Sequence, residues 1–138
     1  MQKTLSIIKP DATKRHLIGE ILAYLEKNGF TICALKKVQL TKAQAEGFYA
    51  EHQGQPFFEK LVNYMSSAPI VAIVLSGENV IPKYRELMGA TDPNEAKKGT
   101  IRKLYALSKT ENSVHGSESE EVAAQEIAYF FSNDEIIE

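Results

Sequence analysis

Hydrophobic positions along the chain recur with two periods, and their order predicts an α+β fold. Strands are predicted where apolar residues alternate or form a short run, at residues 4–9, 30–40 and 70–75. Helices are predicted where apolar residues recur every three or four positions, at residues 18–28, 41–49, 57–66, 79–88 and 119–131. With a last short strand before the final helix, this order fits a ferredoxin-like βαββαβ layout. Such a fold has a four-stranded, mostly antiparallel sheet covered by helices, which we expect on one face.

Residues 89–103 have almost no hydrophobic periodicity and are predicted to form a long loop. A loop of this length in a compact domain is usually either functional or disordered. Lys97, Lys98 and Arg102 near its end favour the binding of an anion. The last segment, residues 132–138, is mostly polar and acidic, and it either docks or frays.

Composition and charge narrow the function. A chain of 138 residues, 43% hydrophobic and 25% charged, is expected to form one globular domain, residues 1–138. Its net charge of −2 argues against a generally basic nucleic-acid-binding surface, although it permits a local basic cleft. Cys33, the single cysteine, cannot form an internal disulfide, and the chain has neither a membrane-length apolar run nor a signal peptide. We therefore expect a cytoplasmic protein that binds neither a membrane nor a specific nucleic acid.

His115 is the strongest candidate for chemistry. It lies in Asn-Ser-Val-His-Gly-Ser, residues 112–117, just before the last predicted helix. Imidazole has a pKa near neutrality, so it acts as nucleophile, base or acid without extreme tuning. Gly116 permits a tight turn beside it. The alternative is a structural loop histidine, which is the commoner role of a single histidine, so the surrounding residues have to decide.

Lys9 and Phe57 are candidates for ligand binding. Lys9 ends the first predicted strand, where Pro10 keeps it extended, so its ammonium group is well placed for an anion. The alternative is a solvated strand end. Phe57 falls outside the apolar stripe of its predicted helix, and an exposed ring can stack on a flat ligand. Isolated apolar side chains on the surface are nevertheless common.

The motif Asn-x-x-His-Gly-Ser at residues 112–117, together with the segment from Leu5 to Asp11, resembles the nucleoside diphosphate kinase family in its bacterial form. The match extends from about residue 4 to about residue 131, nearly the whole chain. The resemblance implies transfer of the γ-phosphoryl group of a nucleoside triphosphate to a nucleoside diphosphate through a phosphohistidine. It also implies ping-pong kinetics and a role in maintaining nucleotide pools.

The resemblance assigns the reacting histidine and its neighbours. The family's phosphate acceptor corresponds to His115, which would become a pros-phosphohistidine. Glu126 corresponds to the carboxylate bonded to the other ring nitrogen, and Ser117 to the serine that bonds this carboxylate. Tyr49 corresponds to a residue that lies close to the histidine in the family.

The resemblance also assigns the nucleotide contacts. The family's phosphate-binding positions correspond to Arg85, Thr91 and Arg102, with His52 as a further contact found in part of the family. Lys9 and Asn112 correspond to the pair that bonds the sugar hydroxyls, with Lys9 also near the transferred phosphate. Phe57 corresponds to the ring on which the base stacks, a contact indifferent to the identity of the base.

The resemblance further implies the cofactor and the assembly. No Gly-x-x-x-x-Gly-Lys-Ser/Thr motif occurs, so the chain is not a P-loop enzyme. Mg²⁺ is expected on the phosphates of the substrate rather than at a protein metal site. Expected partners are nucleoside di- and triphosphates (ATP, ADP, GTP, GDP and deoxy forms). The chain is expected to form a homo-oligomer, a tetramer or a hexamer, with residues 89–103 contributing to subunit contacts.

The sequence departs from the family pattern at three places, and two alternative functions have to be considered. Lys103-Leu104 stands where the family usually has a small residue and an aspartate, which affects either the orientation of Arg102 or a subunit contact. Lys109 and Thr110-Glu111 also differ from some members. Without the resemblance, a phosphocarrier or a non-catalytic nucleotide sensor is the alternative. A carrier would not need the nucleotide contacts, and a sensor would keep binding nucleotide after His115→Ala.

Overall fold

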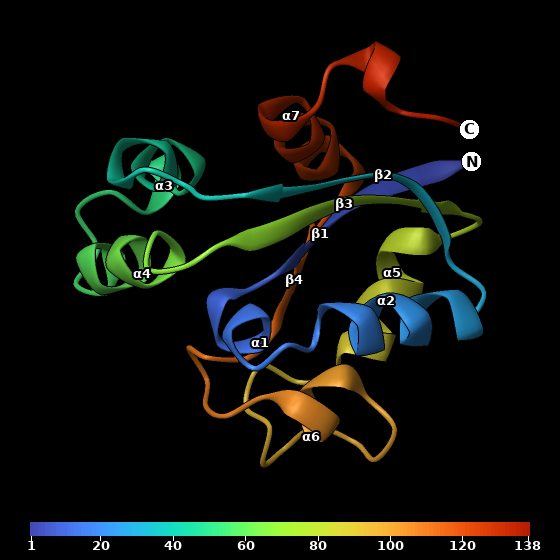
Figure 1. Cartoon of the computed structure of the whole chain (residues 1–138), viewed down its shortest axis with the longest axis horizontal. Coiled ribbons are helices and arrows are strands. Elements are labelled where there is room, and N and C mark those ends of the chain that lie inside the picture. The colour runs from blue at the N-terminus through green and yellow to red at the C-terminus, as the bar shows by residue number, and fades with distance from the viewer.

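The computed structural model describes all residues from Met1 to Glu138 and contains one four-stranded antiparallel sheet. Its strands, in the order β2-β3-β1-β4 across the sheet, are β2 (Thr31–Val38), β3 (Ile70–Gly77), β1 (Gln2–Ile8) and β4 (Val114–Gly116). β1 pairs with β3 along its whole length and with β4 at its end (Figure 1). This order is that of the ferredoxin-like fold, so the predicted fold class is confirmed.

The helices follow the predicted order, with two additions. Their bounds are α1 (Pro10–Lys14), α2 (Ile18–Lys27), α3 (Lys42–Phe48), α4 (Phe58–Met65), α5 (Val80–Met88), α6 (Ile101–Tyr105) and α7 (Glu120–Phe130). Every predicted helix is present with its ends within one residue of the prediction, whereas α1 and α6 were not predicted. Pro10 ends the first strand as expected, but it also begins α1, because its fixed φ suits the first turn of a helix.

Helices cover both faces of the sheet, which corrects the expectation of one covered face. Ile8, Ile73 and Leu75 pack in a core with α2 and α5. Leu5 and Val74, whose side chains point to the opposite face, pack in a second core with α3, α4 and α7. Figure 1 shows α7 on one side of the sheet and α2 and α5 on the other. The reason is visible in β3, where consecutive residues are fully buried, so both of its faces need a cover.

The predicted long loop ends earlier than expected, because α6 begins at Ile101. The hydroxyl of Thr100 accepts a hydrogen bond from the backbone N–H of Lys103 and caps this helix. A five-residue helix is too short to produce a detectable apolar period. The loop is therefore residues 89–100, and the hydroxyl of Tyr24 on α2 donates to the carbonyl of Gly99 within it.

The C-terminal segment docks against the edge of the sheet, which decides between the two alternatives for it. The backbone N–H of Ile137 donates to the carbonyl of Cys33 on β2 at 2.9 Å. The ammonium group of Lys36 on the same strand pairs with Glu135 at 2.9 Å. None of the helices has the length and apolar character needed to span a bilayer.

Candidate active site

His115 lies in the middle of β4, where pairing with Ile7 of β1 holds its backbone against the centre of the sheet. Its side chain is partly buried, with 19% of its surface exposed. Nε2 of the ring lies 2.9 Å from Oε1 of Glu126 on α7. The hydroxyl of Ser117 donates to the same Oε1 at 2.7 Å. The ring is thus held through one nitrogen, and Nδ1 has no hydrogen-bond partner.

Glu126 is a charged acceptor for the ring. Burial raises the pKa of its carboxyl, but the hydrogen bonds from His115 and Ser117, together with the charge of Arg85, bring that pKa below its ordinary value. The carboxylate is therefore ionised near neutral pH. Because an ionised carboxylate can only accept, Nε2 carries the ring proton and Nδ1 carries the free lone pair.

Aromatic rings form a wall that extends from the histidine along α3 and the connection to α4. Phe48 meets the ring of His115 edge to face, with centroids 5.8 Å apart at 73°. Tyr49 packs against Phe48 at 4.9 Å. The wall continues from Tyr49 to His52 at 6.3 Å and from His52 to Phe57 at 5.5 Å. The structure therefore connects Tyr49, His52 and Phe57 in one continuous row.

The two ends of this wall differ in exposure. Tyr49 is buried, and burial together with the charge of Glu126 raises the pKa of its phenol, so the hydroxyl keeps its proton. Phe57 immediately precedes α4 and leaves 48% of its surface exposed. Its ring is therefore accessible to a flat ligand at the end of the wall farthest from His115.

Two arginines donate hydrogen bonds to backbone carbonyls on either side of His115. Nη2 of Arg102 donates to the carbonyl of Val114 at 2.9 Å, and its Nη1 donates to the carbonyl of Gly89 at 3.0 Å. Nη1 of Arg85 donates to the carbonyl of Gly116 at 3.1 Å. The residues immediately before and after the histidine are thus each held by a guanidinium group, so both positive charges lie beside the backbone of His115.

Lys9 and Asn112 form the second polar pair of the site. Nζ of Lys9 donates to Oδ1 of Asn112 at 2.8 Å, and Nδ2 of Asn112 donates to the carbonyl of Lys109 at 2.9 Å. Both ends of the amide are therefore fixed. Burial, with a contribution from the charge of Arg102, lowers the pKa of Lys9 to about 8. Burial also lowers the pKa of Arg102, to which the charge of Arg85 contributes.

Lys9, Arg85 and Arg102 create a positive region beside His115, and no carboxylate fully neutralises it. Arg85 and Arg102 form no ion pair, and Nε of Arg102 is buried without a hydrogen-bond partner. Asp11 is the only acid that raises the pKa of Lys9, and it contributes less than burial does. Such a region attracts an anion, because the charges are held by the fold rather than by counter-charges.

Some sequence candidates remain apart from this cluster. The side chain of Thr91 is exposed and makes no hydrogen bond to another site residue, so the structure leaves its assignment as a prediction. Lys103 and Leu104, which depart from the family pattern, are exposed to solvent. The neighbouring Arg102 donates hydrogen bonds to the carbonyls of both Gly89 and Val114. No group of three or more histidine, cysteine, aspartate or glutamate side chains is arranged to hold a metal ion.

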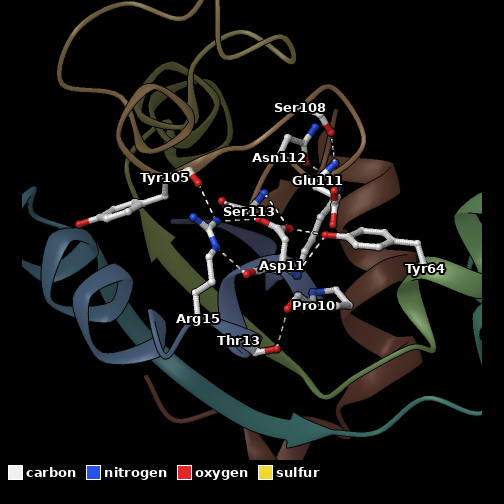
Figure 2. A network of polar contacts seen from close by, with 11 residues as sticks. Pro10, Asp11, Thr13, Arg15, Tyr64, Tyr105, Ser108, Glu111, Asn112 and Ser113 are labelled. Carbon is white, nitrogen blue, oxygen red and sulfur yellow. Dashed lines mark hydrogen bonds and ion pairs between the residues drawn. The ribbon is translucent and has the colours of Figure 1, made fainter.

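Sequence reasoning missed two buried residues behind the site, Asp11 and Ser113. Figure 2 shows the carboxylate of Asp11 at the centre of a polar network that includes Ser113, Arg15 and Tyr64. Both residues lie within the motifs that carry the family resemblance, but neither pattern nor spacing assigns them a contact. The only local signal was the polar character of Asp11 directly after a strand and a proline.

Comparison with known proteins gives a consistent result. A family model described as nucleoside diphosphate kinase matches residues 2–136. The nucleoside diphosphate kinase of Actinobacillus pleuropneumoniae serotype 5b (strain L20) is 66% identical over 137 residues, covering 99% of both chains. That of Haemophilus ducreyi is 65% identical over 136 residues, again covering 99% of both.

Two solved structures share the fold. An orthorhombic crystal form of the Aquifex aeolicus nucleoside diphosphate kinase superposes with a TM-score of 0.95 at 43% identity, covering 99% of both chains. A halophilic nucleoside diphosphate kinase from Halobacterium salinarum, in complex with CDP, gives a TM-score of 0.94 at 39% identity. That match covers 99% of this chain and 91% of the other.

Proposed function

Because this chain belongs to the nucleoside diphosphate kinase family, we propose that it transfers a γ-phosphoryl group between nucleotides through a phosphohistidine at His115. Family membership makes it an enzyme, a phosphotransferase with nucleoside diphosphate kinase activity. The proposed steps go further, to a ping-pong mechanism and to the maintenance of nucleotide pools. One observation carries the phosphohistidine step: the ring of His115 is bonded through Nε2 to an ionised Glu126, and Nδ1 is free.

The first half-reaction follows from this contact. The lone pair of Nδ1 attacks the γ-phosphorus, and the bond from that phosphorus to the bridging oxygen breaks, leaving its electrons on the departing diphosphate. The ring then carries a positive charge, which the Glu126 carboxylate stabilises through Nε2–H. In the second half-reaction a terminal oxygen of another nucleoside diphosphate attacks the phosphorus, and the electrons of the N–P bond return to Nδ1.

The cations beside His115 are proposed to bind the phosphates. Arg85 and Arg102 approach the histidine from both sides, and Lys9 lies near Arg102. Phosphoryl transfer is accelerated mainly by positioning and charge stabilisation, so fixed cations at this place suit its transition state. The unpartnered Nε of Arg102 supports the proposal, because a buried donor without a partner calls for an acceptor. Thr91 and His52 are proposed as additional phosphate contacts.

Lys9 and Asn112 are proposed to bind the sugar, and Phe57 the base. The exposed ring of Phe57 offers a stacking surface, and stacking does not depend on which base is bound. Broad base specificity follows from that. The Halobacterium salinarum relative was solved with CDP, which supports nucleotide binding by this chain as well.

Mg²⁺ is proposed to accompany the nucleotide. Of the acidic side chains near the site, Asp11 already accepts hydrogen bonds from Ser113 and Arg15, and Glu126 already accepts from His115 and Ser117. The remaining donors suited to Mg²⁺ are the phosphate oxygens of the nucleotide, with water. When bound there, the ion would neutralise charge on the phosphates. We also propose that the protein works in the cytoplasm as a homo-oligomer, a tetramer or a hexamer.

Labelling with γ-³²P-ATP and Mg²⁺, without an acceptor, tests the proposal. We expect a label on the protein that is stable to alkali and labile to acid, that passes to added GDP, and that is absent from His115→Ala. A nucleotide-binding measurement on His115→Ala is the control for folding, and we expect binding to persist. Binding without a label in the wild-type protein would indicate a nucleotide sensor instead. A label that never passes to GDP would indicate a phosphocarrier.

A further inference from the structure

Ser113 adopts a backbone conformation that a serine rarely takes. Its φ is 72°, in the left-handed region where a Cβ atom is unfavourable, and the residue is fully buried. It lies between Asn112 and Val114, two residues before His115. The direction in which the chain leaves Ser113 therefore determines where the amide of Asn112 lies relative to the imidazole of His115. Something in the structure has to hold this conformation.

Residues at the junction of β1 and α1 form hydrogen bonds with every polar group of Ser113. Its backbone N–H donates to Oδ1 of Asp11 at 3.2 Å, and its hydroxyl donates to Oδ2 at 3.0 Å. Its carbonyl accepts from the backbone N–H of Lys9 at 2.8 Å. The two contacts with Asp11 join residues 102 positions apart in the sequence. Asp11 thus clamps the left-handed residue from two sides, while Lys9, two residues earlier, also bonds Asn112.

The carboxylate of Asp11 is itself held rigidly. Its side chain is fully buried, and each oxygen has a second donor. The hydroxyl of Tyr64 on α4 donates to Oδ1, and Nη2 of Arg15 donates to Oδ2 at 3.1 Å. Nη2 of Arg15 also donates to the carbonyl of Tyr105 at the end of α6, at 2.6 Å. Figure 2 shows these side chains converging on Asp11 from both sides.

We propose that Asp11 is a positioning residue for phosphoryl transfer, which keeps Ser113 left-handed and thereby orients Asn112 and His115 toward the same nucleotide. The inference rests on the proposed function. Without the carboxylate, Ser113 relaxes to a negative φ, and the chain between the sugar-binding amide and the nucleophile changes direction. Misplacing reacting groups by about 1 Å costs about 10²-fold in rate. The side chain of Asp11 is fully buried and bonds Ser113, so it acts by positioning rather than by contact with the nucleotide, while its charge also raises the pKa of Lys9.

The variant Asp11→Asn tests this with little change in volume. We expect the initial rate of protein labelling by γ-³²P-ATP to fall about 10²-fold. Asp11→Asn also lowers the melting temperature, because the bonds of a buried carboxylate are lost. Thr13→Val is the matched control on the same helix: it removes a hydrogen bond to the carbonyl of Pro69 at 2.6 Å, leaves Ser113 untouched, and should lower the melting temperature without slowing labelling.

Adding Ser113→Gly to Asp11→Asn separates positioning from stability. Glycine takes a positive φ without a Cβ penalty, so we expect the labelling rate to recover at least about fivefold, while the melting temperature does not recover. A rate that stays low together with the melting temperature would make Asp11 a structural residue only and overturn the proposal. Asp11→Asn labelling at the wild-type rate would overturn it too.

A second pair of variants applies if Asp11→Asn does not fold. Ser113→Gly and Ser113→Ala both remove the hydroxyl, but only alanine pays for the left-handed conformation, so the glycine variant should label about fivefold faster. Equal rates, or a faster alanine variant, would overturn the proposal. The wild-type protein in the same assay distinguishes the role of Asp11 from the proposed function, because a wild-type protein that is not labelled contradicts the proposed function itself.

Discussion

Glu126 keeps a negative charge in a partly buried position next to His115. Burial alone would favour its neutral form, but two hydrogen bonds and the nearby Arg85 reverse that preference. The consequence is chemical, because the charge decides which nitrogen of the imidazole holds the proton. For Lys9, in contrast, the surroundings favour the neutral form. Its burial and the neighbouring Arg102 work against its charge, so it releases a proton at lower pH than an exposed lysine.

Replacing Glu126 by glutamine removes the charge and keeps the size of the side chain. We expect the rate of labelling by γ-³²P-ATP to fall by about 10²-fold or more, because the amide no longer stabilises the charged ring or selects its tautomer. ADP should still bind. Glu121→Gln is the control, since it makes the same change at an exposed position of the same helix. Equal labelling rates for the two variants would contradict the role of Glu126.

The pKa of Lys9 predicts how activity depends on pH. Below pH 8 the free enzyme carries a protonated Lys9 that attracts the nucleotide phosphates; above it, that charge is lost. We expect kcat/KM, which reports the free enzyme, to fall with a midpoint near pH 8. Lys9→Arg should not show this fall in whatever activity it retains, because a guanidinium group stays charged. A wild-type profile that is flat from about pH 7 to about 9.5 would contradict the prediction.

At the scale of elements, the end of α5 and the start of α6 meet at Gly89 and Thr100, and their meeting sets the position of Arg102. Gly89 ends α5 with a φ of 88°, and its carbonyl accepts a hydrogen bond from Arg102. A Cβ atom built on Gly89 would lie 2.6 Å from the hydroxyl oxygen of Thr100, which caps α6. Because Gly89 has no side chain, α5 and α6 can approach each other closely. Gly89 thereby also helps to position Arg102, a candidate phosphate-binding residue.

Gly89→Ala is expected to weaken nucleotide binding and to destabilise the fold. The left-handed φ alone costs about 1–2 kcal/mol in free energy of unfolding, and the clash with Thr100 adds to it and displaces Arg102. Gly29→Ala is the control, since Gly29 has a φ of 86° but nothing within 4 Å of its Cβ position. Chemical unfolding and ADP titration measure both effects. Equal effects of the two variants would show that the contact with Thr100 is unimportant.

At the scale of the whole molecule, one sheet carries two cores. Ile8 and Leu5 belong to different cores although they lie on the same strand, so neither core can form without β1. We predict a single cooperative unfolding transition, as expected of one domain spanning residues 1–138. Circular dichroism at far- and near-ultraviolet wavelengths should report the same midpoint in denaturant. Two separate transitions would show that the cores fold independently.

The assembly is a prediction at the same scale. We expect a mass in solution that is four or six times the 15.4 kDa of the chain. Light scattering after size-exclusion chromatography measures it directly. Pro93→Ser tests whether the loop at residues 89–100 contributes to subunit contacts, since a serine there loosens the loop backbone. A wild-type mass equal to that of one chain would contradict the expected oligomer, and an unchanged assembly of the variant at all temperatures would exclude the loop.

The sequence by itself determined the longer elements and most of the candidate site. Apolar periodicity is a local property, so α2, α4 and β3 could be located from it, whereas α1 and α6 are too short to contain a period. The motif at residues 112–117 selected His115, and the family resemblance added Glu126; the structure joins these two side chains, and it also joins Lys9 to Asn112. Their catalytic and binding roles stay predictions.

Only the tertiary structure decided which contacts support that site. The helices on both faces of the sheet, the carbonyls held by Arg85 and Arg102, and the clamp of Asp11 on Ser113 all join segments distant in sequence. A positive φ at a serine has no signature in the local pattern, because a contact formed 102 residues away stabilises it. Local patterns report what a residue prefers, and long-range contacts determine where those preferences are overruled.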